Sequence, residues 1–592
     1  MSRADQVPAS GGQAAGATTS AEAGAAAAAA AAAALGRLGE EFFQTVHTID
    51  PFSATQLGVP GFDMAVPDPS RDGAASGAQR IAGIERRLGV IDARLLSEAD
   101  GINHAVLAHL AWAARSDLEH GLWEANASAG VYVSPQAMVF LSVPTAALDD
   151  AAAVDGYLQR LRGLGGYFDA VTHRYREAKS DGRIPTEVGV RQAIGQLEGH
   201  LRKDIAADTL VTVRLPDPLD HDAIRRAAAD VVSGEVRPAM RRLLACLHHD
   251  LRPAARPDTE VGIRFVPGGA EGYLAAVRRH TTTELSPQEI HQVGLDVLAA
   301  LRSEWAQLGG NVLRISDVPA IHDRLREDRA LRFSDSAQIV RTVTDALRRA
   351  EEARDDWFPA LTTPDCVIEE IDPAEAGNAP LAYYRPPAAG GLRAGAYCVL
   401  TDKPEERFAH EYEALSFHES TPGHHLQIAS AQTLTDLPGY RRFLDAEVCG
   451  YVEGWGLYCE RLADEMGLYT SDLQRLGMLS FDALRACRLV VDTGMHYYGW
   501  PRSRAVDFMW QNTATTRANV ENEVDRYIAW PGQALAYMIG RREIRRLREL
   551  AEDRLGARFD IRAFHGTVLG NGAVPLGVLD QLVTRWIART AS

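Results

Sequence analysis

The stretch SPQEIHQVGLDVLAALRSEWAQLGG, residues 286–310, decides the fold class of this chain. Ser286 suits a helix N-cap, a proline follows at the first helical position, and Glu289 completes a capping box. Apolar residues then recur at helical spacing from Ile290 to Leu308. We expect Gly309-Gly310 to end this helix, because glycine commonly follows the last helical residue.

The same periodicity recurs at residues 85–120, 150–178, 220–250 and 339–350, with no internal repeat and no obvious linker between them. We therefore predict a mainly α fold. A single helical domain would cover residues 35–592, as one large body or as two lobes around a deep cleft.

One region departs from the helical pattern. Between Cys366 and Thr401 the chain has three short β-like runs, CVIEEI, LAYYRPP and GAYCVLT, separated by the turn-rich segments DPAEAGNA and AAGGLRAG. The sequence predicts a β-rich insert at residues 366–401 that forms a small antiparallel sheet. Because the insert directly precedes a cluster of histidines, we expect the sheet near the active site, although a structural hairpin is an equal alternative.

Composition excludes several classes of protein. The chain has 62 Lys+Arg and 79 Asp+Glu, a net charge of −17, so neither nucleic acid nor an anionic membrane is an expected partner. The six cysteines contain no C-x-x-C pair, so a thiolate metal site is not expected. The sequence does not indicate an oligomeric state.

Residues 1–34 are rich in alanine and glycine and end in the run Ala25–Ala34. We assign 1–34 to a disordered Ala/Gly-rich tail outside the helical domain. In more detail, we read residues 1–16 as disordered and 17–47, which extend beyond the tail, as a helix of variable length, because alanine favours helix. The tail lacks the basic and leucine-rich regions of a signal peptide, and no later stretch approaches the length of a membrane span. These features predict a cytoplasmic protein.

Four histidines lie within sixteen residues, and the central text is SFHESTPGHHLQ, residues 416–427. A His-Glu pair followed by another histidine is typical of a hydrolytic zinc site, where the glutamate takes a proton from water that the metal activates. The usual spacing of four residues is exceeded here. A separation of six, from His418 to His424, turns the side chain by about 240° on a regular helix. We expect Pro422-Gly423 to break the helix and return the second histidine.

A third ligand is expected from YVEGWGLYCE, residues 451–460. The segment LPGY at 437–440 reads as a turn, so an antiparallel helix would bring Glu453 beside the histidines. Gly454 and Gly456 are unusual inside a helix unless close packing requires them. The alternative is that Glu453 and Glu460 are solvated helix residues.

HESTPGHHLQ, YVEGWGLYCE, RACRLVVDTGMHYYGW and AWPGQALAYMIG resemble the bacterial family known as domain of unknown function 885. The resemblance covers most of the chain, from DPFSATQLGVPGFD (50–63) to FHGTVLGNGAVPL (564–576). This family is similar to helical zinc peptidases of the thimet oligopeptidase and Taq carboxypeptidase types. The resemblance implies His418, His424 and Glu453 as metal ligands and Glu419 as general base. It favours His424 over His425 as the second ligand.

Further polar residues are candidates for supporting roles, each with a packing role as the alternative. His496, Tyr527 and Tyr537 are candidate donors to the oxyanion. Asp492 is a candidate to orient a ligand histidine, or to pair with Arg488. Candidate substrate-binding residues are Tyr383, Tyr384, Arg485, Arg488 and Gln533.

The sequence therefore predicts a zinc-dependent hydrolase that cleaves peptide or other amide bonds, with another divalent transition metal as an alternative cofactor. Two other functions stay open. One is a biosynthetic metal-dependent hydrolase or lyase acting on a small amide or amino-acid derivative. The other is a non-enzymatic helical binding protein.

Overall fold

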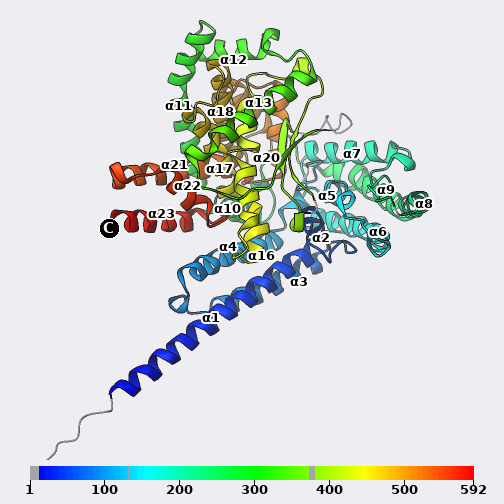
Figure 1. Cartoon of the computed structure of the whole chain (residues 1–592). Coiled ribbons are helices and arrows are strands. Elements are labelled where there is room, and N and C mark those ends of the chain that lie inside the picture. The colour runs from blue at the N-terminus through cyan, green and yellow to red at the C-terminus, as the bar shows by residue number, and fades with distance from the viewer. Residues whose placement is uncertain (1–12, 131, 218, 372–379, 392) are drawn as a thin grey trace, which may run out of the picture.

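The computed structural model describes residues 13–130, 132–217, 219–371, 380–391 and 393–592. Helices make up most of it, and one small sheet lies among them (Figure 1). The predicted mainly α fold is confirmed. The predicted turn at 372–379 lies outside the described residues.

The α-helices between Gln13 and Leu251 are, in chain order, Gln13–Ile49 (α1), Pro51–Leu57 (α2), Arg71–Leu88 (α3), Glu98–His120 (α4), Pro135–Ser142 (α5), Ala151–Ser180 (α6), Glu187–Arg202 (α7), His221–Val231 (α8) and Arg237–Cys246 (α9). Those that follow are Gly269–Thr281 (α10), Pro287–Val312 (α11), Val318–Glu327 (α12), Ser336–Trp357 (α13), Tyr412–Glu419 (α14), Ser430–Thr433 (α15), Gly439–Phe443 (α16), Cys449–Glu465 (α17), Asp472–His496 (α18), Arg502–Asn512 (α19), Arg517–Ala529 (α20), Ala536–Leu555 (α21), Ile561–Leu569 (α22) and Leu576–Ala591 (α23).

Helix α11 begins as predicted, because both hydrogen bonds of the capping box at Ser286 and Glu289 are present. Its predicted end was wrong, since the helix continues to Val312. Gly309 serves packing instead. A side chain on Gly309 would collide with Ile321 of α12 and would lie 2.7 Å from the carbonyl oxygen of Ile315.

The alanine-rich tail also differs from its assignment as disordered. Helix α1 begins at Gln13, and Figure 1 shows it projecting away from the body. The helix that alanine favours over 17–47 is therefore present, because alanine has the highest helix propensity of all residues. Residues 1–12 lie outside the described part of the chain.

The three strands are Cys366–Glu370 (β1), Ala382–Arg385 (β2) and Gly395–Val399 (β3). They match the three predicted β-like runs, but the sheet is mixed rather than antiparallel. Its order is β1-β3-β2, with β1 parallel and β2 antiparallel to β3. Every residue of β3 is buried, which suits the central position, and β2 is left as an edge strand beside α14.

Buried apolar side chains form two large cores. The larger core joins α1–α4 and α10–α23, and the second joins mainly residues 127–251, which we call the smaller lobe. Figure 1 shows helices α6–α9 of the smaller lobe grouped at one side of the molecule. No helix among the described residues is long and apolar enough to cross a membrane.

Candidate metal centre

The His-Glu pair lies at the carboxyl end of α14, where His418 is buried and Glu419 is the last helical residue. The chain then turns at Pro422-Gly423 and continues into a short π-helical turn, His425–Ala429. Gly423 is required here, because any side chain on it would collide with the carbonyl oxygen of His418. The helix break predicted from the sequence is present and brings His424 back beside His418.

Helix α17 supplies the third candidate ligand. Oε2 of Glu453 lies 3.7 Å from Nε2 of His418 and 3.4 Å from Nε2 of His424. One ligand atom from each of these three residues lies within 4.8 Å of the others. Two imidazole nitrogens and one carboxylate oxygen are the donor set of many catalytic zinc sites, which keep a further position for water. The chemistry of the donor set therefore fits zinc.

Glycines in α17 allow this grouping. A side chain at Gly456 would come within 2.8 Å of Nε2 of His418 and 3.0 Å of Cε1 of His424, so the glycine leaves room for both imidazoles. Gly454 meets the backbone of Gly540 in α21, which lets the two helices approach closely. Both glycines thus have the packing role that their position in a helix suggests.

The second nitrogen of His418 has a partner of its own. Nδ1 of His418 lies 2.8 Å from Oε1 of Glu460, which is fully buried one heptad beyond Glu453 on α17. Burial lowers the pKa of His418, but the carboxylates of Glu453 and Glu460 outweigh it and raise the pKa to about 9. Burial raises the pKa of Glu453, and the two histidines more than reverse this effect. The site is thus strongly coupled electrostatically.

Glu419 is positioned by the edge of the sheet. The backbone N–H of Tyr384 in β2 donates a 2.9 Å hydrogen bond to Oε2 of Glu419. Burial raises the pKa of Glu419 above its ordinary value, while the adjacent His418 and His424 oppose the shift. A carboxylate with a raised pKa beside a metal site suits proton transfer near neutral pH.

His425 points in a different direction from His424. Its Nδ1 lies 3.0 Å from the hydroxyl of Tyr384, and the two rings meet edge to face. This contact separates His425 from the ligand group, so the structure favours His424 as the second ligand. It also places the side chain of Tyr384 beside the histidine segment, as expected for a residue near the site.

Tyr537 stacks on His418 with 6.3 Å between ring centroids. The guanidinium of Arg488 lies 4.4 Å from the Tyr537 ring centroid, and that of Arg485 lies 5.9 Å from it. Arg485 also lies 3.5 Å from Oε1 of Glu460. Both arginines therefore surround the aromatic neighbour of a candidate ligand, and a role in binding substrate stays a prediction for them.

Two predicted catalytic residues, His496 and Tyr527, lie in a buried network instead. Nδ1 of His496 accepts from the backbone N–H of Ile263, and its Nε2 donates to the carbonyl of Tyr527. The Tyr527 hydroxyl accepts from Arg488 and donates to Glu523. Because these polar atoms are committed inside the core, His496 and Tyr527 are not placed to donate to a substrate.

Asp492 also has partners other than those predicted. Its oxygens accept from the hydroxyl of Tyr273 at 2.7 Å and from the backbone N–H of Gly532 at 3.1 Å. Both expectations for Asp492, orientation of a ligand histidine and pairing with Arg488, were therefore wrong. Glu460 takes the first of these roles and Glu523 pairs with Arg488 at 2.7 Å.

Two candidate substrate-binding residues remain. The side chain of Gln533 is buried, where it accepts from Arg526 at 2.9 Å and donates to the sulfur of Cys449 at 3.6 Å. Tyr383 is half-buried and packs against Ile371, Ala396, Cys398 and Leu400. A role for Gln533 in substrate binding conflicts with its buried contacts, whereas Tyr383 stays a candidate.

Sequence reasoning missed two residues of this centre. Glu460 was treated as a possible solvated residue, although its spacing of seven from Glu453 places both on one helical face. The role of Gly456 beside the imidazoles was not assigned, although glycine inside a helix indicated close packing. In both cases the signal was a spacing within α17.

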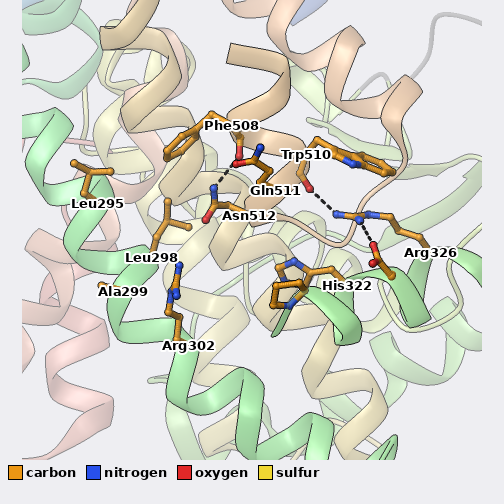
Figure 2. Close-up of a pocket in the computed structure, with 12 residues that line it drawn as sticks. Leu295, Leu298, Ala299, Arg302, His322, Arg326, Phe508, Trp510, Gln511 and Asn512 are labelled. Atoms are coloured by element: carbon orange, nitrogen blue, oxygen red, sulfur yellow. Dashed lines mark hydrogen bonds and ion pairs between the residues drawn. The ribbon is translucent and has the colours of Figure 1, made fainter. Parts of the chain in front are cut away.

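A cavity of about 830 Å³ lies elsewhere, between α11, α12 and α19 (Figure 2). Leu298 and His322 line it, together with Phe508 and Asn512. Arg326 at its edge donates to Asp323 and to the carbonyl of Trp510. The cavity contains none of the three candidate ligands in its lining, so we assign it no part in the metal chemistry.

Solved structures share this fold, including one from Colwellia psychrerythraea and one from Shewanella oneidensis. One is described as the putative lipoprotein from Colwellia psychrerythraea, with 25% sequence identity and a TM-score of 0.85 over 95% of this chain and 99% of that chain. The other is described as a putative lipoprotein of unknown function from Shewanella oneidensis, with 18% identity and a TM-score of 0.70 over 93% of this chain and 99% of that chain.

No curated protein matches the chain. A family model does match, over residues 51–583, a range that includes α14, α17 and the sheet. The family is described as bacterial protein of unknown function (DUF885). The resemblance that the histidine and glutamate segments indicated is thus confirmed at the level of the family, and the chain belongs to the DUF885 family.

Proposed function

We propose that the chain is a zinc-dependent hydrolase that cleaves peptide bonds with Glu419 as general base. The observation that carries this proposal is the grouping of one donor atom each from His418, His424 and Glu453 within 4.8 Å, next to Glu419. A purely structural zinc site requires no adjacent general base. The proposal also accords with the similarity between the DUF885 family and helical zinc peptidases that we expected from the sequence.

In the proposed reaction, His418 and His424 would hold the metal through their imidazoles and Glu453 through its carboxylate. Zinc bound there would supply a Lewis acid that polarises the amide carbonyl and lowers the pKa of water. Glu419 accepts the proton of the attacking water and later returns it to the leaving amine. The N–H of Tyr384 holds Oε2 of Glu419, so we assign the proton transfer to Oε1.

Tyr537 is the donor that we assign to the oxyanion. Its ring stacks on His418, and burial together with the charge of Glu453 raises its pKa to about 12. The phenol therefore stays protonated at neutral pH and can donate a hydrogen bond where negative charge develops. Of the three candidate donors from the sequence, Tyr537 alone keeps this role in our proposal.

The edge strand β2 supports a peptide as the substrate. Leu381, directly before β2, accepts from the N–H of Leu400 after β3, whereas the N–H of Tyr384 points away from β3 to Glu419. An extended peptide can add to such an edge through backbone hydrogen bonds. This arrangement favours a peptide over a small amide derivative.

Metal analysis and substrate screening test the proposal together. Atomic emission should find about one zinc per chain after gentle purification, as expected for one site of this type. The zinc-loaded protein should then cleave members of a peptide library in preference to small-molecule amides. Absence of zinc without activation by added metal would overturn the proposal, and cleavage of small amides alone would overturn the peptide assignment.

A further inference from the structure

The backbone of Tyr132 is held in an unusual conformation. Its φ angle is 69°, in the left-handed region that few residues other than glycine adopt. Such a conformation persists only where the surrounding structure enforces it, and it is concentrated at functional sites. The side chain is 54% exposed, so core packing does not account for it.

The loop around Tyr132 is fastened to the smaller lobe. Gln136 donates to the carbonyl of Ser128 at 2.5 Å, and Gln196 of α7 donates to the carbonyl of Ala129 at 3.1 Å. The hydroxyl of Ser134 donates to the carbonyl of Gly130 at 2.8 Å. These hydrogen bonds lie on both sides of Tyr132 along the chain, so the smaller lobe holds the backbone on either side of this residue in place.

The ring of Tyr132 meets an aromatic residue of the larger core. Its centroid lies 6.3 Å from that of Trp530, with 30° between the ring planes. Trp530 follows α20 directly, and this segment is tied down because Asp492 accepts from Gly532. Nearby, Gln192 of α7 donates to Asp525 of α20 at 2.8 Å, which joins the smaller lobe to the same helix.

Trp530 lies close to the start of α17, because Gln533, three residues after it, donates to the sulfur of Cys449, which is one turn before Glu453. Burial, followed by the charges of Cys398, Glu419 and Glu453, raises the pKa of Tyr132. Tyr132 therefore lies close enough to Glu419 and Glu453 for their charges to act on it.

We propose that Tyr132 and Trp530 form an aromatic subsite that binds a large apolar or aromatic side chain of the substrate beside the metal centre. Aromatic rings offer a large apolar surface and favour offset or edge contacts with other rings. The two lobes each supply one wall of this subsite. The inference rests on the proposed function and adds the class of side chain that the hydrolase prefers.

Two zinc-binding probes test the subsite without requiring turnover. L-phenylalanine hydroxamate and acetohydroxamate share the group that binds zinc and differ in the benzyl side chain. Calorimetric titration of the zinc-loaded full chain should show that Tyr132→Ala lowers the affinity for the phenylalanine probe by about tenfold. The affinity for acetohydroxamate should stay unchanged. Tyr132→Phe should bind both probes within about twofold of the wild type, because the ring is retained.

Tyr498→Ala is the matched control, since Tyr498 is 45% exposed and also contacts an aromatic ring, that of His291. It should not alter either affinity. Unchanged binding of the phenylalanine probe to Tyr132→Ala would overturn the subsite, and so would equal weakening of both probes. If Tyr132→Phe loses as much affinity for the phenylalanine probe as Tyr132→Ala, the hydroxyl rather than the ring makes the contact, and the aromatic subsite is overturned.

Peptide cleavage by the same proteins separates the two proposals. If the probes bind in the expected pattern but no peptide is cleaved, the subsite stands and the hydrolase proposal fails. If peptides are cleaved and Tyr132→Ala retains the wild-type preference for apolar side chains, the subsite fails alone. A wild type that binds neither probe overturns both.

Discussion

Nδ1 of His418 lies 2.8 Å from Oε1 of Glu460, so a buried carboxylate holds the ring of a candidate metal ligand from the side opposite to Glu453. A carboxylate in this position fixes the tautomer of the imidazole and increases its basicity. A hydrogen bond donated from Nδ1 to this carboxylate would leave Nε2 free to bind a metal.

Replacement of Glu460 should therefore weaken metal binding without removing a ligand. We expect Glu460→Gln to lower zinc affinity by about 10- to 100-fold, because the amide keeps an oxygen acceptor but loses the charge. Competition with a chelator measures this. Glu465→Gln is the control on the same helix, since Glu465 is an exposed partner of Arg548. Equal affinity of the Glu460 variant and the wild type would contradict the role of Glu460.

Replacement of His424 and replacement of His425 should have very different effects on zinc affinity. We expect His424→Ala to lower zinc affinity by more than about 100-fold, because loss of a ligand should exceed the loss of an outer partner. His425→Ala should change it only slightly, since His425 bonds to Tyr384 instead. Zinc content and the zinc-induced rise in Tm report the difference. Similar losses in the two variants would show that the ligand is misassigned.

Loss of the general base should stop turnover and preserve the metal site. Glu419→Gln should lower the rate of peptide cleavage by about 10²- to 10⁴-fold, because a positioned base contributes this much to proton transfer. Zinc content should equal that of the wild type, because Glu419 is not one of the three grouped ligands. A variant that turns over at the wild-type rate would refute the assignment.

Gly456 offers a steric test. In Gly456→Ala the new methyl would lie 2.8 Å from His418 and 3.0 Å from His424, so both imidazoles must move and zinc affinity should fall. Overpacking of this kind also destabilises folded proteins by about 1–3 kcal/mol. Gly195→Ala is the control, since no atom lies within 4 Å of the added methyl and α7 should gain about 0.5–1 kcal/mol. Urea unfolding measures the change in stability, and zinc titration measures the change in zinc affinity. Wild-type values of both in Gly456→Ala would contradict the steric role of Gly456.

The buried carboxyl group of Asp492 should make the stability of the protein depend on pH. Burial raises its pKa in the folded protein from 3.8 to about 7, so the folded state favours the protonated acid. The contribution of the protonated acid to the free energy of unfolding is fully present below pH 3.8 and is lost as the pH rises through about 7. Asp492→Asn cannot ionise and should escape this loss.

Between pH 5 and pH 8, we therefore expect the free energy of unfolding of Asp492→Asn to gain about 2–3 kcal/mol relative to the wild type. Urea unfolding at both pH values measures it. A relative change in the opposite direction would mean that the carboxylate, rather than the acid, is the form that the fold prefers.

Much of the fold was predictable because its signals are local. The capping box at Ser286, the three β-like runs and the alanine-rich helix depend on residues within a few positions of each other. The mixed pairing of the sheet was not predictable in this way. The position of β3 between β1 and β2 depends on burial of both its faces by distant helices.

The residues of the candidate site were likewise predictable from the sequence only in part. Residue types and spacing alone singled out His418, Glu419 and Glu453 as candidates, because a hydrolytic metal site demands imidazoles, a carboxylate and a base in a short pattern. They left His424 and His425 open as the second ligand, and the choice of His424 came from the resemblance to the DUF885 family. The separation of six between the histidines also indicated a broken helix. The predicted deep cleft and cytoplasmic location stay predictions, and cell fractionation tests the latter.

Only the tertiary structure decided which of the remaining polar residues lie beside the three candidate ligands and which are buried elsewhere. His496 and Asp492 share α18 with Arg485, yet their partners come from α20 and from residues 263, 273 and 532. Tyr132 of the smaller lobe meets the ring of Trp530, almost 400 residues further along the chain. Such partners are set by the packing of distant segments, because a buried polar atom bonds to whatever donor or acceptor the fold brings beside it, and sequence spacing does not encode that choice.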